Sequence, residues 1–119
     1  MSREEAKKYS YRVEWDGRDE VYVGYVSEFR GLSAHGGSPE EAFEEIRKVV
    51  EYVLEEMKES GEVAPEPLGE RKYSGKLVVR MSSSLHKQLA REAAEEGVSL
   101  NQWIVGNLGG VRRLKAGVN

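Results

Sequence analysis

Alternating apolar and polar positions near the N-terminus predict two strands joined by a tight turn. Over residues 9–16 the apolar side chains fall on one face and the polar side chains on the other, with the period of two of a half-buried strand. Asp16-Gly17 supplies turn chemistry, and residues 21–26 return as a second strand. This second strand is apolar on both faces, which indicates a central position. A short third strand is expected over residues 32–35, ending at Gly36-Gly37.

Helical spacing replaces this alternation after the third strand. Ser38 is suited to cap a helix, Pro39 suits the first helical position, and Glu41 can close a capping box. The helix is expected to run to about Glu59 and to stop at Gly61. Its apolar positions form one stripe that would lie on the sheet: Phe43, Ile46, Val50, Val53, Leu54 and Met57.

Residues 76–81 alternate again, and only helical patterns follow them. A serine at 82–83 can cap a first helix, which Gly97 would end in the left-handed conformation. Ser99-Leu100-Asn101-Gln102 is a capping box that opens a second helix, ending at Gly109. The C-terminal part of the chain is therefore predicted to be strand, helix, helix.

The lone strand at residues 76–81 would leave its backbone N–H and C=O groups unpaired, so its expected partner is the same strand of a second copy. We therefore expect a homodimer, whose ribbon would carry Lys76, Val78 and Arg80 on its outer face. The sequence leaves open whether dimers pair into tetramers. The dimer core is expected to combine apolar residues of the strand and both helices: Leu77, Val79, Met81, Leu85, Leu89, Trp103, Ile104 and Leu108.

Charge divides the chain into two parts. Residues 1–68 carry 9 Lys/Arg and 17 Asp/Glu, a net −8, whereas residues 69–119 carry 9 and 4, a net +5. The acidic part could bind a basic protein, or its charge could merely solvate one helix. The basic part could bind the phosphate backbone of a nucleic acid. The expected organisation is a domain over 1–68, a linker over 69–75, a second domain over 76–110 and a basic tail over 111–119.

Several classes of protein are disfavoured by what the 119 residues lack. No cysteine is present, and no apolar run approaches the roughly 20 residues that cross a bilayer. The N-terminus is too polar for a secretory signal, so a cytoplasmic protein with no membrane partner is expected. The carboxylates are concentrated in one turn or on one solvent-exposed helix face, and the two histidines lie far apart in the sequence. We therefore expect no catalytic site, no metal site and no cofactor. Trp15 and Trp103 are most simply core residues.

The order strand, helix, glycine turn and Ser-capped helix resembles the ribbon-helix-helix repressors. The passage from Lys76 to Leu108, with Gly97-Val98-Ser99-Leu100-Asn101-Gln102, resembles the version found in HicB antitoxins. The N-terminal strands followed by Gly37-Ser38-Pro39-Glu40-Glu41-Ala42 are similar to the HicB partial ribonuclease-H-like domain, so the resemblance spans about residues 9–108. It implies an α+β protein: a β-β-β-α domain, with a further short strand near Val63 or Leu68, then a ribbon-helix-helix dimerisation domain.

The resemblance also implies a function. Such a chain would neutralise a HicA-like mRNA-cleaving toxin by occlusion and repress its own operon by binding operator DNA. In a major groove, Arg80 suits guanine and Val78 a thymine methyl group, with Lys76 as a further contact. The predicted helix start at Ser99, Leu100 and Asn101 could bind a phosphate of the DNA backbone. The alternative is that Ser99 simply caps the helix and has no role in DNA binding.

Three acidic residues of the N-terminal half are candidates to contact the toxin: Asp19, Glu20 and Glu28. A role in solubility alone accounts for their charge equally well. Two other hypotheses stay open. One is a ribbon-helix-helix regulator whose N-terminal domain binds a small ligand or drives oligomerisation. The more distant one is a metal-dependent nuclease.

Overall fold

The computed structural model describes residues 2–109, so the predicted tail over 111–119 lies outside the described residues. The chain forms two compact units that divide between Ser74 and Gly75, a point inside the predicted linker. Its elements follow in this order: α1 (Ser2–Ala6), β1 (Tyr11–Asp16), β2 (Val21–Val26), β3 (Ser33–Gly36), α2 (Pro39–Ser60), a 3₁₀ turn (Leu68–Glu70), α3 (Ser83–Glu96) and α4 (Leu100–Leu108).

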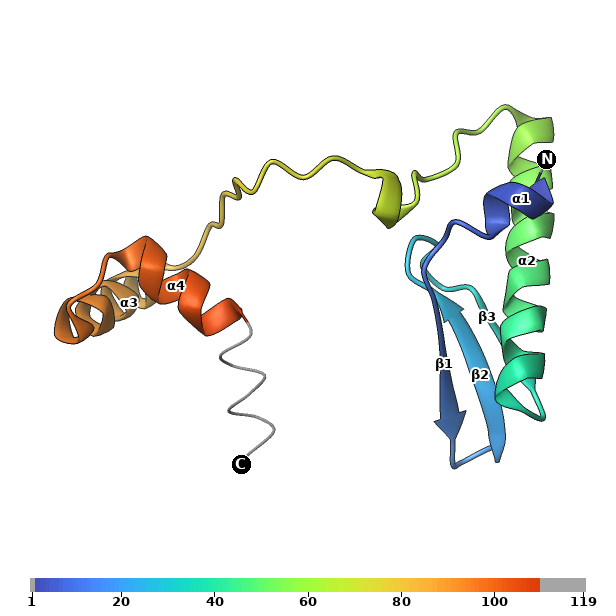
Figure 1. Ribbon diagram of the computed structural model, residues 1–119, viewed down its shortest axis with the longest axis horizontal. Helices are drawn as coiled ribbons and strands as arrows, with labels where there is room; N and C mark the ends of the chain where they lie inside the picture. The colour runs from blue at the N-terminus through green and yellow to red at the C-terminus, as the bar shows by residue number, and fades with distance from the viewer. Residues whose placement is uncertain (1, 110–119) are drawn as a thin grey trace. The chain divides into compact units, whose positions relative to one another are not determined.

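The first unit is a three-stranded antiparallel sheet with α2 along one face (Figure 1). The strand order is β1-β2-β3, which confirms the α+β class and the central place of the second strand. Tyr11 pairs with Val26 in the first ladder and Tyr22 with Gly36 in the second. β1 begins two residues later than predicted, because the N–H of Ser10 is bound by a side chain rather than by the ladder.

Two glycines allow α2 to lie directly on the sheet. A Cβ atom at Gly24 would stand 2.7 Å from the carbonyl oxygen of Ala42, and one at Gly36 would stand 2.8 Å from the Cα atom of Ala42. The sequence pattern predicted that Gly36 would break the third strand. Gly36 is instead the last residue of β3, where its missing side chain makes room for the first turn of α2.

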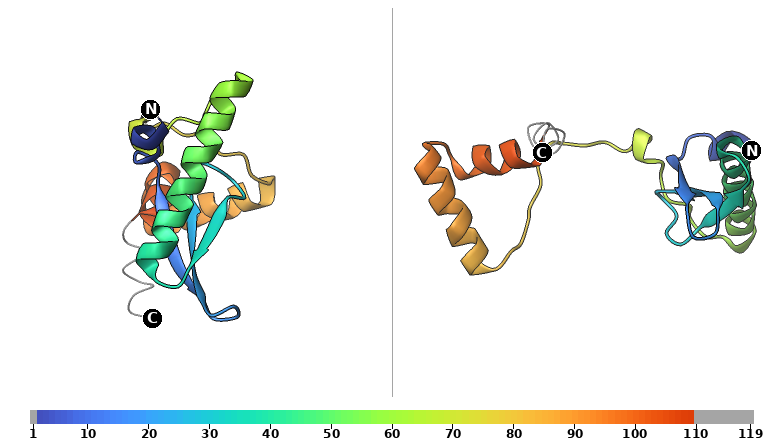
Figure 2. Two further views of the ribbon diagram at one scale, coloured as in Figure 1. Left: turned by 90° about the vertical axis from the view of Figure 1, so that its right-hand side faces the viewer. Right: turned by 90° about the horizontal axis from the view of Figure 1, so that it is seen from below.

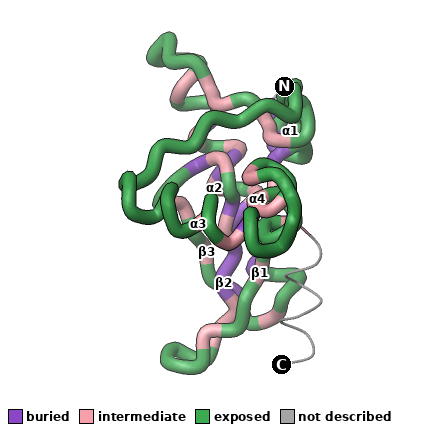
Figure 3. The backbone as a smooth tube through the Cα atoms, turned by 90° about the vertical axis from the view of Figure 1, so that its left-hand side faces the viewer, coloured by how far each residue is buried: buried purple, intermediate pink, exposed green. Residues whose placement is uncertain are grey.

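The core of the first unit lies between α2 and the sheet, where Figure 3 shows the buried segments. Ile46 and Val50 are completely buried, and the other members surround them: Ala6, Tyr9, Val26, Phe29 and Leu54. Most of the predicted stripe is therefore in place. Phe43 is exposed, although its ring forms a T-shaped pair with that of Tyr11, with centroids 5.4 Å apart. The short helix α1, which the pattern did not predict, contributes Ala6 to this core.

The ends of α2 follow the predicted chemistry with one difference. The Ser38 hydroxyl accepts a hydrogen bond from the N–H of Glu41 at 3.1 Å, and Gly61 closes the helix with a φ of 78°. The Glu41 carboxylate accepts from the N–H of Gly37, one residue before the cap, rather than from Ser38 itself. The boundaries of the helix are thus fixed by local residues.

The chain after α2 is fastened to the first unit. The Tyr9 hydroxyl donates to the carbonyl of Pro65 at 2.7 Å, and the Tyr73 hydroxyl donates to the carbonyl of Leu68 at 3.0 Å. The further strand expected near Val63 or Leu68 is not formed, because Leu68 opens a 3₁₀ turn and Val63 lies outside any regular element.

The second unit contains α3 and α4, which lie at an angle to each other (Figure 2). Gly97 ends α3 with a φ of 73°, as predicted, and its neighbour Val98 donates back to the carbonyl of Ala93 at 3.1 Å. The indole N–H of Trp103 donates to the Glu92 carboxylate at 3.1 Å and ties the two helices together. Residues 76–81 form neither helix nor strand in this single copy.

Candidate functional site

The segment predicted to be the ribbon, residues 76–81, is exposed on both of its faces. Leu77 is 81% exposed and Val79 60%, on the face predicted to be buried, while Val78 on the other face is 87% exposed. Arg80 is also exposed. A strand forms only against a partner strand, and the structure contains one copy of the chain. The pairing of two copies through this segment therefore stays a prediction.

Helices α3 and α4 bury little of their own apolar surface. Ala93 is the buried residue among those described from Gly75 to Gly109. Of the residues predicted to form the dimer core, Leu89, Trp103 and Ile104 are half-buried. The others are exposed in the single copy: Leu77, Val79, Met81, Leu85 and Leu108. A core of this size cannot by itself offset the entropy cost of ordering about 35 residues.

The start of α4 has the geometry that the sequence predicted. The Ser99 hydroxyl accepts from the N–H of Gln102 at 3.0 Å, and the Gln102 side chain accepts from the N–H of Ser99 at 3.1 Å. The Ser99 hydroxyl oxygen is therefore used inside the capping box. An anion at this helix start would meet the N–H groups of Leu100 and Asn101, with the positive end of the helix dipole behind them.

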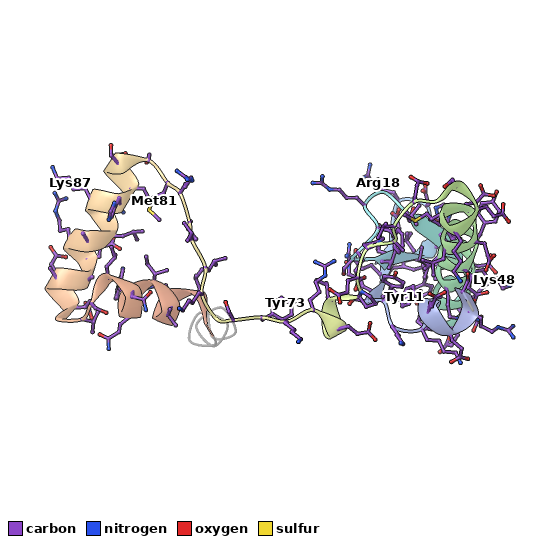
Figure 4. The ribbon with its side chains drawn as sticks, turned by 90° about the horizontal axis from the view of Figure 1, so that it is seen from above. Tyr11, Arg18, Lys48, Tyr73, Met81 and Lys87 are labelled. Atoms are coloured by element: carbon purple, nitrogen blue, oxygen red, sulfur yellow. The ribbon has the colours of Figure 1, made fainter. Side chains whose placement is uncertain are left out.

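Basic side chains of the second unit lie on its surface. Arg80 precedes α3, and Lys87 projects outward from that helix (Figure 4). Lys76 is exposed as well. Segment 76–81 thus carries two cations, Lys76 and Arg80, on either side of Val78 along the chain.

Glu28, predicted to face a toxin, holds the first unit together. Its carboxylate accepts hydrogen bonds from the N–H and the hydroxyl of Ser10, both at 3.0 Å, and from the N–H of Leu68 at 2.9 Å. Partial burial raises the pKa of Glu28, but these donors outweigh it, so the pKa lies below its ordinary value. Sequence patterns gave no signal of this role, because its partners lie 18 and 40 residues away.

The turn between β1 and β2 carries the other two predicted toxin-facing residues. Asp19 and Glu20 are exposed, and Glu20 has a positive φ of 53°. The Asp16 carboxylate accepts from the N–H of Arg18 at 2.9 Å and shapes the turn. The structure therefore presents Asp19 and Glu20 at the tip of the β1–β2 hairpin.

Trp15, predicted to be a core residue, is 56% exposed. It lies on the edge strand opposite Tyr22, which in turn lies opposite Gly36, where α2 begins. The helix therefore starts over the third strand, two strands away, and leaves Trp15 uncovered. Its ring packs against Tyr22 in a T-shaped pair with centroids 5.0 Å apart.

The sheet face away from α2 is polar at its edge. The Arg12 guanidinium lies 4.3 Å from the centre of the Tyr25 ring and pairs with the Glu14 carboxylate at 2.6 Å. Within residues 2–109, no group of three or more His, Asp or Glu side chains is arranged to hold a metal ion. No helix in the same range is both long and apolar enough to cross a bilayer.

Comparison with known proteins gives one match. Residues 58–108 match the model of the HicB family, from the last turn of α2 to the end of α4. The match includes residues 76–81 and both helices of the second unit, so the resemblance of those residues to the HicB family is confirmed. Most of the first unit lies outside it. No curated protein and no solved structure matches the chain.

Proposed function

Because residues 58–108 match the model of the HicB family, whose members are toxin–antitoxin components, we propose that this chain is an antitoxin that also represses its own operon. Its first unit would cover a HicA-like ribonuclease toxin, and its second unit would bind operator DNA as a dimer. The observation that carries the proposal is the family match over a segment whose apolar residues lie uncovered in a single copy.

The dimer follows from the energetics of the second unit. Leu77 and Val79 would be buried between two antiparallel 76–81 segments, with α3 and α4 of both copies beneath them. Burying an aliphatic side chain contributes about 1.5–3 kcal/mol, and two copies contribute every such residue twice. Pairing also satisfies backbone N–H and C=O groups that a single strand leaves to water.

DNA binding follows from the same pairing. In a two-stranded ribbon, Lys76, Val78 and Arg80 of each copy share the face opposite Leu77 and Val79. A two-stranded ribbon fits the major groove, where Arg80 can donate two hydrogen bonds to guanine. The starts of the two α4 helices would then bind phosphates and fix the register on the duplex.

Neutralisation of the toxin follows from the charge of the first unit. Residues 1–68 carry a net −8, and a ribonuclease that binds RNA phosphates is expected to be basic. An acidic domain can therefore occupy the surface that the toxin uses for RNA. The mechanism is occlusion, and it requires no catalytic group of this chain.

Co-expression with the product of the adjacent gene tests the antitoxin function. We expect a small basic protein that arrests growth alone, co-purifies with this chain and cleaves RNA only in its absence. The alternative, a regulator that binds a ligand or only oligomerises, predicts no such neighbour and no effect on RNA cleavage. Cleavage that continues at full rate with a twofold excess of the chain would refute the antitoxin function.

A further inference from the structure

We propose that the free end of the β1–β2 hairpin is the point at which the toxin docks, with Trp15 as its anchor. The hairpin patch is defined as Trp15, Tyr22, Asp19 and Glu20. The inference rests on the proposed antitoxin function and deepens it, because it names the surface and the chemistry that the surface would accept: a cationic, Lys- or Arg-bearing face of a protein.

Trp15 has the features of an interface anchor. It is more than half exposed, while the T-shaped contact with Tyr22 at 5.0 Å restricts its ring. A side chain already held in place loses less conformational entropy on binding than a freely rotating one. Among the described residues, its indole N–H donates to no acceptor, whereas that of Trp103 binds Glu92. Exposed tryptophans of this kind are enriched among the residues that dominate binding energy.

A hollow of about 400 Å³ adjoins Trp15 on the hairpin. Its walls include Val23 and Tyr25, the acidic residues Glu14 and Asp16, and the basic residue Arg18. By strand alternation the first four of these residues belong to the sheet face that α2 does not cover, whereas Trp15 and Tyr22 lie on the face that carries α2. The hollow therefore opens on the opposite face of the hairpin from the Trp15–Tyr22 pair, and the docking point is defined by the hairpin patch itself.

The charge of the hairpin selects a cationic partner. The Glu14 carboxylate is paired with Arg12, and that of Asp16 binds the backbone of the turn. Within residues 2–109 the carboxylates of Asp19 and Glu20 have neither an ion-pair nor a hydrogen-bond partner. They lie in the turn that follows β1, close in sequence to Trp15, and the face of an aromatic ring attracts a guanidinium or ammonium group. Arg18, which lies in the same turn and also lines the adjoining hollow, weakens this field.

A second copy of the chain is the other occupant that this surface could take. Two hairpin patches would bring Asp19 and Glu20 of both copies together, and like charges across an interface oppose association. The charge of the patch therefore favours a basic partner over self-association. Self-association remains an outcome that the experiment must detect.

Trp15 can report on its own burial. The chain contains two tryptophans, so Trp103→Phe leaves Trp15 as the only indole fluorophore. The full-length variant is titrated with the catalytically inactive product of the adjacent gene while emission and acrylamide quenching are recorded. We expect a blue shift and at least a threefold fall in quenching on binding. Trp15→Ala should weaken the complex by at least about 30-fold.

Tyr52→Ala is the matched control, because Tyr52 is an exposed aromatic residue among the carboxylates of α2, away from the hairpin. Its affinity should stay within threefold of the parent. A complex that forms with unchanged Trp15 quenching, or equally well with Trp15→Ala, would overturn the docking site and leave the antitoxin function standing. Absence of any complex with the parent chain would overturn both. Dissociation of toxin-free oligomers by Trp15→Ala would assign the patch to self-association instead.

Discussion

Glu28→Gln is expected to loosen the first unit, because one carboxylate holds three donors. In the parent, one oxygen accepts from the Ser10 N–H and the other from the Ser10 hydroxyl and the Leu68 N–H. The amide keeps the shape but has a single acceptor oxygen, so its NH₂ group must face at least one donor. Allowing for partial exposure, the loss is about 2 kcal/mol. For a unit of this size that corresponds to about 8–16 °C in Tm.

Chemical denaturation provides the assay. Trp103→Phe serves as the background, so that Trp15 fluorescence reports on the first unit alone. Glu56→Gln, on an exposed position of α2, is the matched control and should unfold within about 0.5 kcal/mol of the parent. Hydrogen exchange at the Leu68 amide should accelerate in Glu28→Gln before global unfolding. Equal unfolding midpoints for Glu28→Gln and the parent would refute the structural role of Glu28.

The pH dependence has a defined sign. The pKa of Glu28 is lower in the folded chain than its ordinary value, so the ionised carboxylate stabilises the fold above the ordinary value. That contribution is lost as the pH falls through the lowered folded pKa. The stability difference between the parent and Glu28→Gln should therefore be constant near neutrality and shrink on acidification below about pH 4.5. A difference that grows on acidification would contradict this assignment.

Three further substitutions test other parts of the molecule. Gly36→Ala places a methyl group against the first turn of α2 and should cost about 1–3 kcal/mol in thermal unfolding, whereas Gly69→Ala, which meets open space, should be tolerated. Val79→Asp should shift the chain towards monomer in light scattering at micromolar concentration, and Val63→Asp, at a position that is more exposed and lies in the first unit, should not. Arg80→Ala should cost about 1–3 kcal/mol of operator affinity in a gel-shift titration and reduce discrimination against random DNA, and unchanged discrimination would remove its base contact.

The hairpin and the helices were predictable because their signals are local. Alternation in residues 9–16 and 21–26, the Ser38 cap and the glycines that end helices act within a few residues of where they stand. The sequence also predicted that residues 76–81 have no partner strand in their own unit. The family match over residues 58–108 agrees with the resemblance drawn from those residues.

Long-range packing decided the rest. Whether Trp15 is core or surface depends on where α2 begins over the sheet, and the close approach of α2 at Gly24 and Gly36 sets that position. The role of Glu28 depends on Leu68 returning to it from 40 residues away. The sequence by itself therefore determined the elements and their ends, because caps, turns and periodicity are short-range effects. Only the tertiary structure decided which side chains those elements cover and which they leave to a partner.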